Sequence, residues 1–193
     1  MDIKHSTREK ILDEVFILIY LNGYNATSMS MILKQCNIPK GSLYHYFKSK
    51  KEMVLASIRE RLAPKINLFY ELNPVDNEHP IDTIINNIIK ISQKDELVKY
   101  GCPLNRLNQE MSSVDKDFDI ELNMIYDSIR EKIIKLLNNA PLKDNIHKEN
   151  LTEFIIASIW GSLSLSPSQS SKERYLSSVE YLISYLKSLK NKH

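Results

Sequence analysis

The fold of this chain is decided by residues 27–47, which read TSMSMILKQCNIPKGSLYHYF. Thr27 and Ser28 can cap a short helix in which apolar residues recur at intervals of three and four. Asn37 follows, one of the few residues other than glycine that tolerate the left-handed conformation of a tight turn. Pro39 suits the first turn of a second helix, because the N–H that proline lacks would have no partner there. The segment therefore predicts two short helices joined by a tight turn, the arrangement that places its second helix in the major groove of DNA.

The second predicted helix has a face rich in aromatic side chains. Leu43 and Phe47 are four residues apart and should pack inward against the first helix of the chain. Tyrosine offers a hydroxyl to phosphates and a ring to sugars or thymine methyl groups, and lysine offers a point charge to phosphates. The exposed face would carry Ser42, Tyr44, His45 and Tyr46, with Lys40 before it and Lys48, Lys50 and Lys51 after it. We therefore expect this helix to face DNA.

Two capping boxes mark the helices on either side of this segment. Residues 6–9 (STRE) open a helix with apolar residues at helical spacing, and Gly23 can end it in a left-handed conformation. Residues 49–52 (SKKE) open another helix, which we expect to bend or end near Pro64. The sequence thus predicts four helices around the tight turn.

Composition indicates a globular chain with an ordinary core. Of the 193 residues 42% are apolar and 26% are charged, and only four are glycine, which disfavours strands joined by turns. Cys36 and Cys102 cannot form a disulfide framework and fit a reducing cytosol. The opening MDIKHSTREK lacks the layout of a signal peptide, and the longest apolar run, residues 15–21, is too short for a bilayer. We therefore expect a cytoplasmic protein without a membrane segment.

Charge is distributed unevenly along the chain. Residues 1–61 contain ten Lys and Arg against six Asp and Glu, whereas residues 62–193 contain 16 against 18. A basic segment joined to a mildly acidic remainder favours an anionic partner for the first segment only.

The remaining two thirds of the chain also show helical periodicity. Amphipathic or apolar helices are predicted around residues 81–91, 104–111, 118–136, 151–165 and 176–189. Residues 72–79 and 138–147 are candidate hinges, and residues 166–171 form a polar linker. No segment alternates with period two, so the predicted fold class is all-α: a helix-turn-helix domain followed by a second helical domain.

Residues 7–53 resemble the DNA-binding domain of TetR/AcrR-type transcriptional regulators. The matching stretches are TREKIL (7–12), NGY (22–24), ATS (26–28), KGSLYHYF (40–47) and SKKE (49–52). The chain departs from the family pattern at Ser30 and Met31, where a basic and an acidic residue are common, and also at Leu33, Asn37 and Pro39. The resemblance implies that DNA is lined by Thr27, Ser28, Lys40, Gly41, Ser42, Tyr44, His45, Tyr46 and Lys50.

The same resemblance assigns different functions to different segments of the chain. Residues 1–50 would form the DNA-binding domain, a helix over about residues 50–70 would connect, and residues 51–193 would form the ligand-binding and dimerisation domain. The last two helices would build a homodimer interface, where Gly161 lets a partner helix approach closely. The dimer would present two recognition helices to a palindromic operator in double-stranded DNA, as a repressor released by a small-molecule inducer.

A ligand pocket between the middle helices would be lined by aromatic and sulfur-containing side chains. The sequence offers few charged residues for the interior of this domain, so an apolar or aromatic ligand would fit such a pocket best. Most aromatic residues at helical spacing belong to the core, so only a minority of the candidates would touch the ligand. The candidates are Phe69, Tyr70, Tyr100, Cys102, Met111, Phe118, Met124, Tyr126, Phe154 and Trp160.

Cys102 admits two interpretations. It lies at a turn bounded by Gly101 and Pro103, where a helix N-terminus with Lys99 and Arg106 nearby could lower its pKa and make it a sensor of oxidants or electrophiles. The stretch resembles a branch of the family with a Gly-Cys turn before a Leu-x-x-Glu helix, some of whose members sense electrophiles through that cysteine. The other interpretation is a buried residue that shapes the pocket wall.

Two other functions remain open from the sequence. An architectural DNA-binding protein without a ligand would share the helix-turn-helix but would bind DNA with weak sequence preference. A small helical enzyme is the weaker alternative, since the five histidines are scattered and no glycine-rich phosphate loop or Gly-x-Ser-x-Gly motif is present. We expect no catalytic site, metal or cofactor.

Overall fold

The computed structural model describes residues 6–74, 78–165 and 171–190, and within these ranges the regular elements are all helices. Besides them, the described residues contain one isolated antiparallel bridge, between Leu142 and Lys190. The prediction of an all-α fold is therefore confirmed. Residues 166–170 of the predicted linker and residues 75–77 of a predicted hinge lie outside the described ranges. No helix among the described residues combines the length and the apolar character needed to cross a membrane.

The chain forms two compact units that are interleaved in sequence. Unit 1 comprises Met1–Ile66 and Arg106–Ile125, and unit 2 comprises Asn67–Asn105 and Tyr126–His193. The units are therefore divided at three points rather than by one cut near residue 50. The assignment of functions to residues 1–50 and 51–193 stays a prediction.

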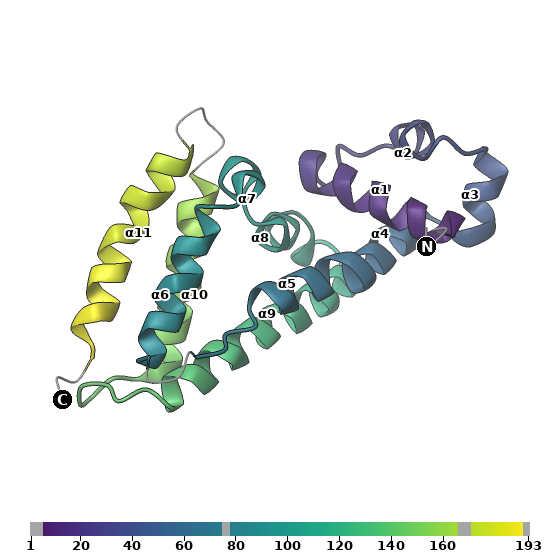
Figure 1. Cartoon of the computed structure of the whole chain (residues 1–193). Helices are drawn as coiled ribbons and strands as arrows, with labels where there is room; N and C mark the ends of the chain where they lie inside the picture. The colour runs from purple at the N-terminus through teal and green to yellow at the C-terminus, as the bar shows by residue number, and fades with distance from the viewer. Residues whose placement is uncertain (1–5, 75–77, 166–170, 191–193) are drawn as a thin grey trace, which may run out of the picture. The chain divides into compact units, whose positions relative to one another are not determined.

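Unit 1 begins with the four helices that the sequence predicted (Figure 1). They are α1 (Thr7–Asn22), α2 (Met29–Cys36), α3 (Lys40–Tyr46) and α4 (Lys50–Ser57). The side chains of Ser6, Ser28 and Ser49 each accept a hydrogen bond from a backbone N–H in the first turn of α1, α2 and α4. Asn37 takes the left-handed conformation after α2, with φ of 51°. Local capping thus sets the boundaries of the helix-turn-helix.

The helix does not end near Pro64, and the expected bend there stays a prediction. The helix continues from α4 through a π-helical turn, η1 (Ile58–Leu62), into α5 (Ala63–Phe69). Within this turn the N–H of Ala63 reaches the carbonyl oxygen of Ile58, five residues back. The wider turn just before Pro64 lets the helix proceed past a residue that cannot donate a backbone hydrogen bond.

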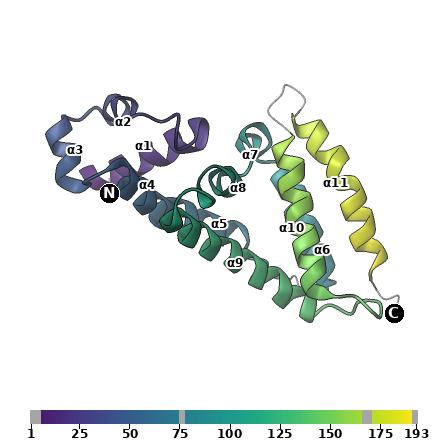
Figure 2. The same ribbon diagram turned by 180° about the vertical axis from the view of Figure 1, so that it is seen from behind.

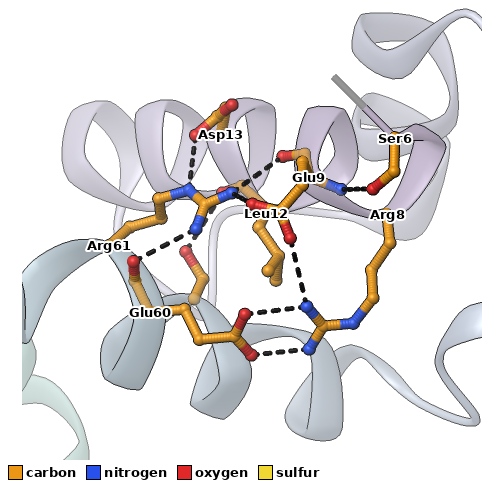
Figure 3. A network of polar contacts seen from close by, with 8 residues as sticks. Ser6, Arg8, Glu9, Leu12, Asp13, Glu60 and Arg61 are labelled. Carbon is orange, nitrogen blue, oxygen red and sulfur yellow. Dashed lines mark hydrogen bonds and ion pairs between the residues drawn. The ribbon is translucent and has the colours of Figure 1, made fainter. Parts of the chain in front are cut away.

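Charged side chains fix α1 against η1 (Figure 3). Arg8 donates two hydrogen bonds to the carboxylate of Glu60, and Arg61 pairs with both Glu9 and Asp13. The Arg8 guanidinium lowers the pKa of Glu60 below its ordinary value. These pairs tie α1 to the helix that follows the helix-turn-helix.

Unit 1 is completed by residues from much later in the chain. Helix α8 (Pro103–Leu107) and the π-helical turn η2 (Asn108–Ser112) lead into α9 (Lys116–Asn138), which confirms the predicted helices around residues 104–111 and 118–136. The boundary between the units falls inside α5, α8 and α9.

Unit 2 is built on its last helix, which packs against three others (Figures 1 and 2). Helix α11 contacts α6, α7 and α10. The bounds are α6 (Pro80–Ile91), α7 (Asp95–Tyr100), α10 (Lys148–Ser164) and α11 (Ser171–Ser188). The six-residue α7 is too short to show a period and was not predicted.

Candidate nucleic-acid interface

Helix α3 exposes the side chains that the sequence assigned to DNA and buries the two assigned to the core. Leu43 and Phe47 are almost inaccessible to solvent, and the Arg8 guanidinium from α1 stacks over the Phe47 ring at 5.4 Å, so the predicted inward packing is confirmed. The opposite side is exposed at Lys40, Gly41, Tyr44, His45 and Tyr46, and Ser42 is half-buried.

The exposed face of α3 carries aromatic rings, a lysine ammonium group and a glycine with empty space beside it. The Lys40 ammonium lies 5.8 Å from the centre of the Tyr44 ring, and the rings of His45 and Tyr46 meet edge to face at 5.1 Å. At Gly41 a Cβ atom would meet nothing within 4 Å. The protein's own packing therefore does not require glycine here, so the space is free for a partner.

Three exposed lysines of α2, α3 and the residues after α3 have no acidic partner among the described residues of unit 1. Within the described part of unit 1, Lys34, Lys40 and Lys48 are exposed and form no ion pair with an Asp or Glu. Lysines without an acidic partner are available to phosphates. The exposed lysines of α2, of α3 and of the residues between α3 and α4 can thus bind a polyanion.

Two of the residues assigned to DNA point into the protein instead. Lys50 donates hydrogen bonds to the carbonyl oxygens of Tyr24 and Thr27, at 2.9 and 3.0 Å, and burial lowers its pKa. The Thr27 side chain is fully buried and donates to the carbonyl oxygens of Gly23 and Leu18. These two side chains hold the turn between α1 and α2, and the expectation that they line DNA stays a prediction.

Lys51 also differs from the expectation. Its ammonium pairs with Asp115 and Asp117 at the start of α9, both at 2.7 Å, instead of standing free for a phosphate. The pairing lowers the pKa of Asp115 and raises that of Lys51. Ser28 stays exposed, with its hydroxyl capping α2 and contacting the hydroxyl of Ser30 at 2.8 Å.

A carboxylate that the sequence did not assign to this region lies at the same turn. Glu110 of η2 accepts hydrogen bonds from the backbone N–H groups of Tyr24 and Asn25, at 2.8 and 2.7 Å. Nearby, Arg106 donates to the carbonyl oxygen of Tyr20 at 2.7 Å. No local pattern could have found these contacts, because they join residues more than 80 positions apart.

The residues predicted to line a ligand pocket are divided between the two units. Met111 and Phe118 are buried in unit 1, where the Phe118 ring meets Tyr24 edge to face at 4.9 Å; Met124, also in unit 1, is exposed. Unit 2 contains the remaining candidates, Phe69, Tyr70, Tyr100, Cys102, Tyr126, Phe154 and Trp160. Of these, Phe154 is about half exposed.

Cys102 does not have the properties of an accessible, low-pKa sensor. The backbone N–H groups of Leu104 and Asn105 do bond to its sulfur and lower the pKa, as expected at a helix start. Burial is the larger effect, and the pKa of the Cys102 thiol is raised. Burial of the thiol favours the interpretation of Cys102 as a wall residue, and the sensor interpretation stays an untested prediction.

Polar groups without partners lie inside unit 2. The hydroxyl of Thr83 and the indole N–H of Trp160 are buried and have no hydrogen-bond partner among the described residues. Trp160 packs edge to face on Tyr126 at 5.4 Å, and burial together with a hydrogen bond to Glu153 raises the pKa of Tyr126 to about 12. A donor left unpaired in a core costs free energy that a bound acceptor would recover.

Helices α10 and α11 expose an apolar face. Phe154 and Tyr185 stack edge to face at 5.8 Å while both remain partly exposed, and Tyr181 is 83% exposed. Gly161 is also exposed, and a Cβ atom there would meet nothing within 4 Å. Exposed aromatic side chains beside an open glycine are typical of a helix–helix interface.

Comparison with known proteins gives matches at both sequence and structure level. Residues 11–57 match the family model of bacterial regulatory proteins described as the tetR family. An uncharacterized HTH-type transcriptional regulator in the lacX 3′ region of Lactococcus lactis subsp. lactis is 36% identical over 166 residues, which is 83% of each chain. The HTH-type transcriptional repressor NemR of Escherichia coli K12 is 37% identical over 60 residues, 31% of this chain and 30% of NemR.

Solved structures match over nearly the whole chain. A TetR transcriptional regulator from Chloroflexus aurantiacus has a TM-score of 0.82 at 23% identity and covers 95% of both chains. The reduced form of E. coli NemR has a TM-score of 0.79 at 21% identity and covers 97% of this chain and 100% of NemR. These likenesses show the same fold.

Proposed function

Because the chain belongs to the TetR family of bacterial regulatory proteins and is a DNA-binding transcriptional regulator, we propose that it is a repressor that leaves its operator when a small ligand binds. The observation that supports DNA binding through α3 is the exposed face with Lys40, Gly41 and Tyr44, whose open glycine no internal contact explains. The name of NemR, a transcriptional repressor, supports the direction of regulation. The proposed regulatory role would be carried out in the cytoplasm and would require no catalytic chemistry.

The DNA contacts that we propose are those of exposed groups. Base edges and sugars would meet Tyr44, His45 and Tyr46, and phosphates would meet Lys40 and Lys48. Gly41, Ser42 and Ser28 would lie against the DNA backbone. Lys50 and Thr27 would support this surface from inside the protein.

The proposed assembly is a homodimer formed through α10 and α11. The stacked pair of Phe154 and Tyr185, the exposed Tyr181 and the open position at Gly161 would meet their counterparts in a second copy. A two-fold dimer would present two α3 helices to successive major grooves of a palindromic operator, about 34 Å apart.

The proposed inducer is a small, largely apolar or aromatic molecule that binds in unit 2. The unpartnered N–H of Trp160 and hydroxyl of Thr83 favour a ligand that carries a hydrogen-bond acceptor. The buried Cys102 would form part of the wall and would not be modified.

Selection of DNA by the purified protein tests this function. We expect the full chain to enrich a palindrome from a random duplex library and to bind it, in fluorescence anisotropy, far more tightly than a random duplex. A screen of uncharged aromatic compounds should then yield one that weakens this binding. Equal affinity for selected and random duplexes would exclude a sequence-specific regulator and favour an architectural DNA-binding protein.

A further inference from the structure

The turn that joins α1 to α2 is shaped to receive a carboxylate. Gly23 has φ of +86°, and a Cβ atom there would lie 2.7 Å from Oε2 of Glu110. The two oxygens of this carboxylate take the next two backbone N–H groups, those of Tyr24 and Asn25. Glycine is therefore required both by the backbone conformation and by the room that Glu110 occupies.

A cation holds the same turn through its carbonyl groups. The Lys50 ammonium bonds to the carbonyl oxygens of Tyr24 and Thr27 and lies 4.1 Å from the centre of the Tyr24 ring. Burial lowers the pKa of Lys50, and the negative charge of Glu110 opposes that shift. The turn thus lies between an anion that binds its amides and a cation that binds its carbonyls.

The turn leads directly into the DNA-binding surface. It ends at Thr27, and the next residue, Ser28, caps α2. On the other side, the residues that follow Glu110 pack against the turn through the Phe118 ring on Tyr24. A shift of the turn would therefore move the start of α2 and, through Asn37, the helix that follows.

We propose that Glu110 is a positioning residue for DNA binding: it holds the turn before α2, although it lies far outside the helix-turn-helix in sequence. This proposal rests on the proposed function, because its effect is measured on operator affinity. It assigns to η2 a direct part in shaping the DNA-binding surface.

The sign of the effect separates this role from simple electrostatics. Replacing Glu110 by glutamine removes a negative charge from unit 1, which by itself would strengthen binding to phosphates. Glutamine also offers only one acceptor oxygen, so one of the two N–H groups loses its partner. Loss of one charge-assisted hydrogen bond corresponds to about a tenfold change in an equilibrium constant.

The test compares E110Q and E110A with E121Q. Glu121 lies in the same segment and pairs with Arg59 without contacting the turn, so E121Q removes the same charge as a matched control. We expect anisotropy with the selected duplex to give about tenfold weaker binding for E110Q, a larger loss for E110A, and a change within about twofold for E121Q. Stoichiometric titration should show a full active fraction for all three.

Hydrogen exchange supplies a second measurement. The amides of Tyr24 and Asn25 should exchange faster in E110Q than in the wild type or E121Q. Unchanged or tighter binding of E110Q, unchanged exchange at these amides, or a reduced active fraction with wild-type affinity would each overturn the proposal. The proposed function fails if the wild type itself does not distinguish its selected duplex from random DNA. The Glu110 proposal alone fails if the wild type does distinguish them and E110Q binds the selected duplex as tightly as the wild type.

Discussion

The Lys50 ammonium donates a hydrogen bond to the carbonyl oxygen of Tyr24 at 2.9 Å and lies over the ring of the same residue. A side chain that the family resemblance assigns to DNA is therefore engaged inside the protein. Its contribution to DNA binding would be to hold the turn rather than to neutralise a phosphate.

Salt dependence distinguishes these two roles. In K50M the carbonyl groups of Tyr24 and Thr27 lose their donor, so the free energy of unfolding should fall by about 1–3 kcal/mol. Operator affinity should fall too, while the slope of log affinity against log salt stays the same. K48A should leave stability unchanged and reduce that slope by about 2, one phosphate per subunit. A smaller slope for K50M would show that Lys50 meets phosphate.

Gly41 allows stability and DNA binding to be separated. Because a Cβ atom there has open space, G41A should fold normally and gain up to about 1 kcal/mol from the better helix propensity of alanine. The same methyl group would enter the space proposed for DNA, so operator affinity should fall at least about tenfold. Thermal unfolding and anisotropy measure the two effects. A stabilised variant with wild-type affinity would remove Gly41 from the interface.

Both thiols should be inert in the native protein. Burial raises the pKa of Cys36 to about 11 and also raises the pKa of Cys102, so thiolate is scarce at neutral pH. Iodoacetamide at pH 7.5 should give no adduct by intact mass, and two adducts per chain after unfolding. Rapid labelling of Cys102 in the folded protein would restore the sensor interpretation.

The proposed dimer predicts a monomeric variant. F154D places a charge on the exposed side of α10 beside Tyr185, where burial against a second copy would be costly. Sedimentation at micromolar concentration should show a dimer for the wild type and a monomer for F154D, with weaker operator binding. L68D is the control, since Leu68 is also exposed but lies on α5. A dimeric F154D would place the interface elsewhere.

Acid should weaken the attachment of α1 to η1. The pKa of Glu60 is lowered by Arg8, so this pair stabilises the folded state above the ordinary carboxyl pKa of 4.5, and the contribution is lost as pH falls through the lowered value. Because both side chains are about a third exposed, the effect should stay within about 1 kcal/mol. Urea unfolding of wild type and E60Q should differ at pH 7 and converge as the pH falls below the lowered pKa of Glu60. A constant difference across this range would assign the stabilisation to another group.

Local sequence signals predicted the first four helices because residues at the helix ends mark where these helices begin or stop. The caps Ser6, Ser28 and Ser49 and the left-handed Asn37 act on backbone groups a few residues away, and the structure has all four. The π-helical turn before Pro64 was missed, since it depends on how the continuing helix is held.

The candidate site was only partly predictable for the same reason. Exposure of Tyr44 and His45 follows from helical spacing, whereas the inward direction of Lys50 depends on a turn 23 residues earlier. Burial raises the pKa of Cys102 more than the hydrogen bonds at the helix start lower it. The helix start could be predicted from the local sequence, whereas burial depends on the packing of the whole of unit 2. Glu110 reaches Asn25 across 85 positions, and no periodicity records such a contact.

The interleaving of the two units has a consequence for how the protein is made. A ribosome delivers the chain from its first residue onward, so α1 to α4 emerge before the residues that complete unit 1, Arg106–Ile125. Until then the amides of Tyr24 and Asn25 have no carboxylate to bind. A nascent chain that has emerged only to residue 70 would therefore present a helix-turn-helix with a loose turn, and competence for DNA would arise only after Arg106–Ile125 has emerged.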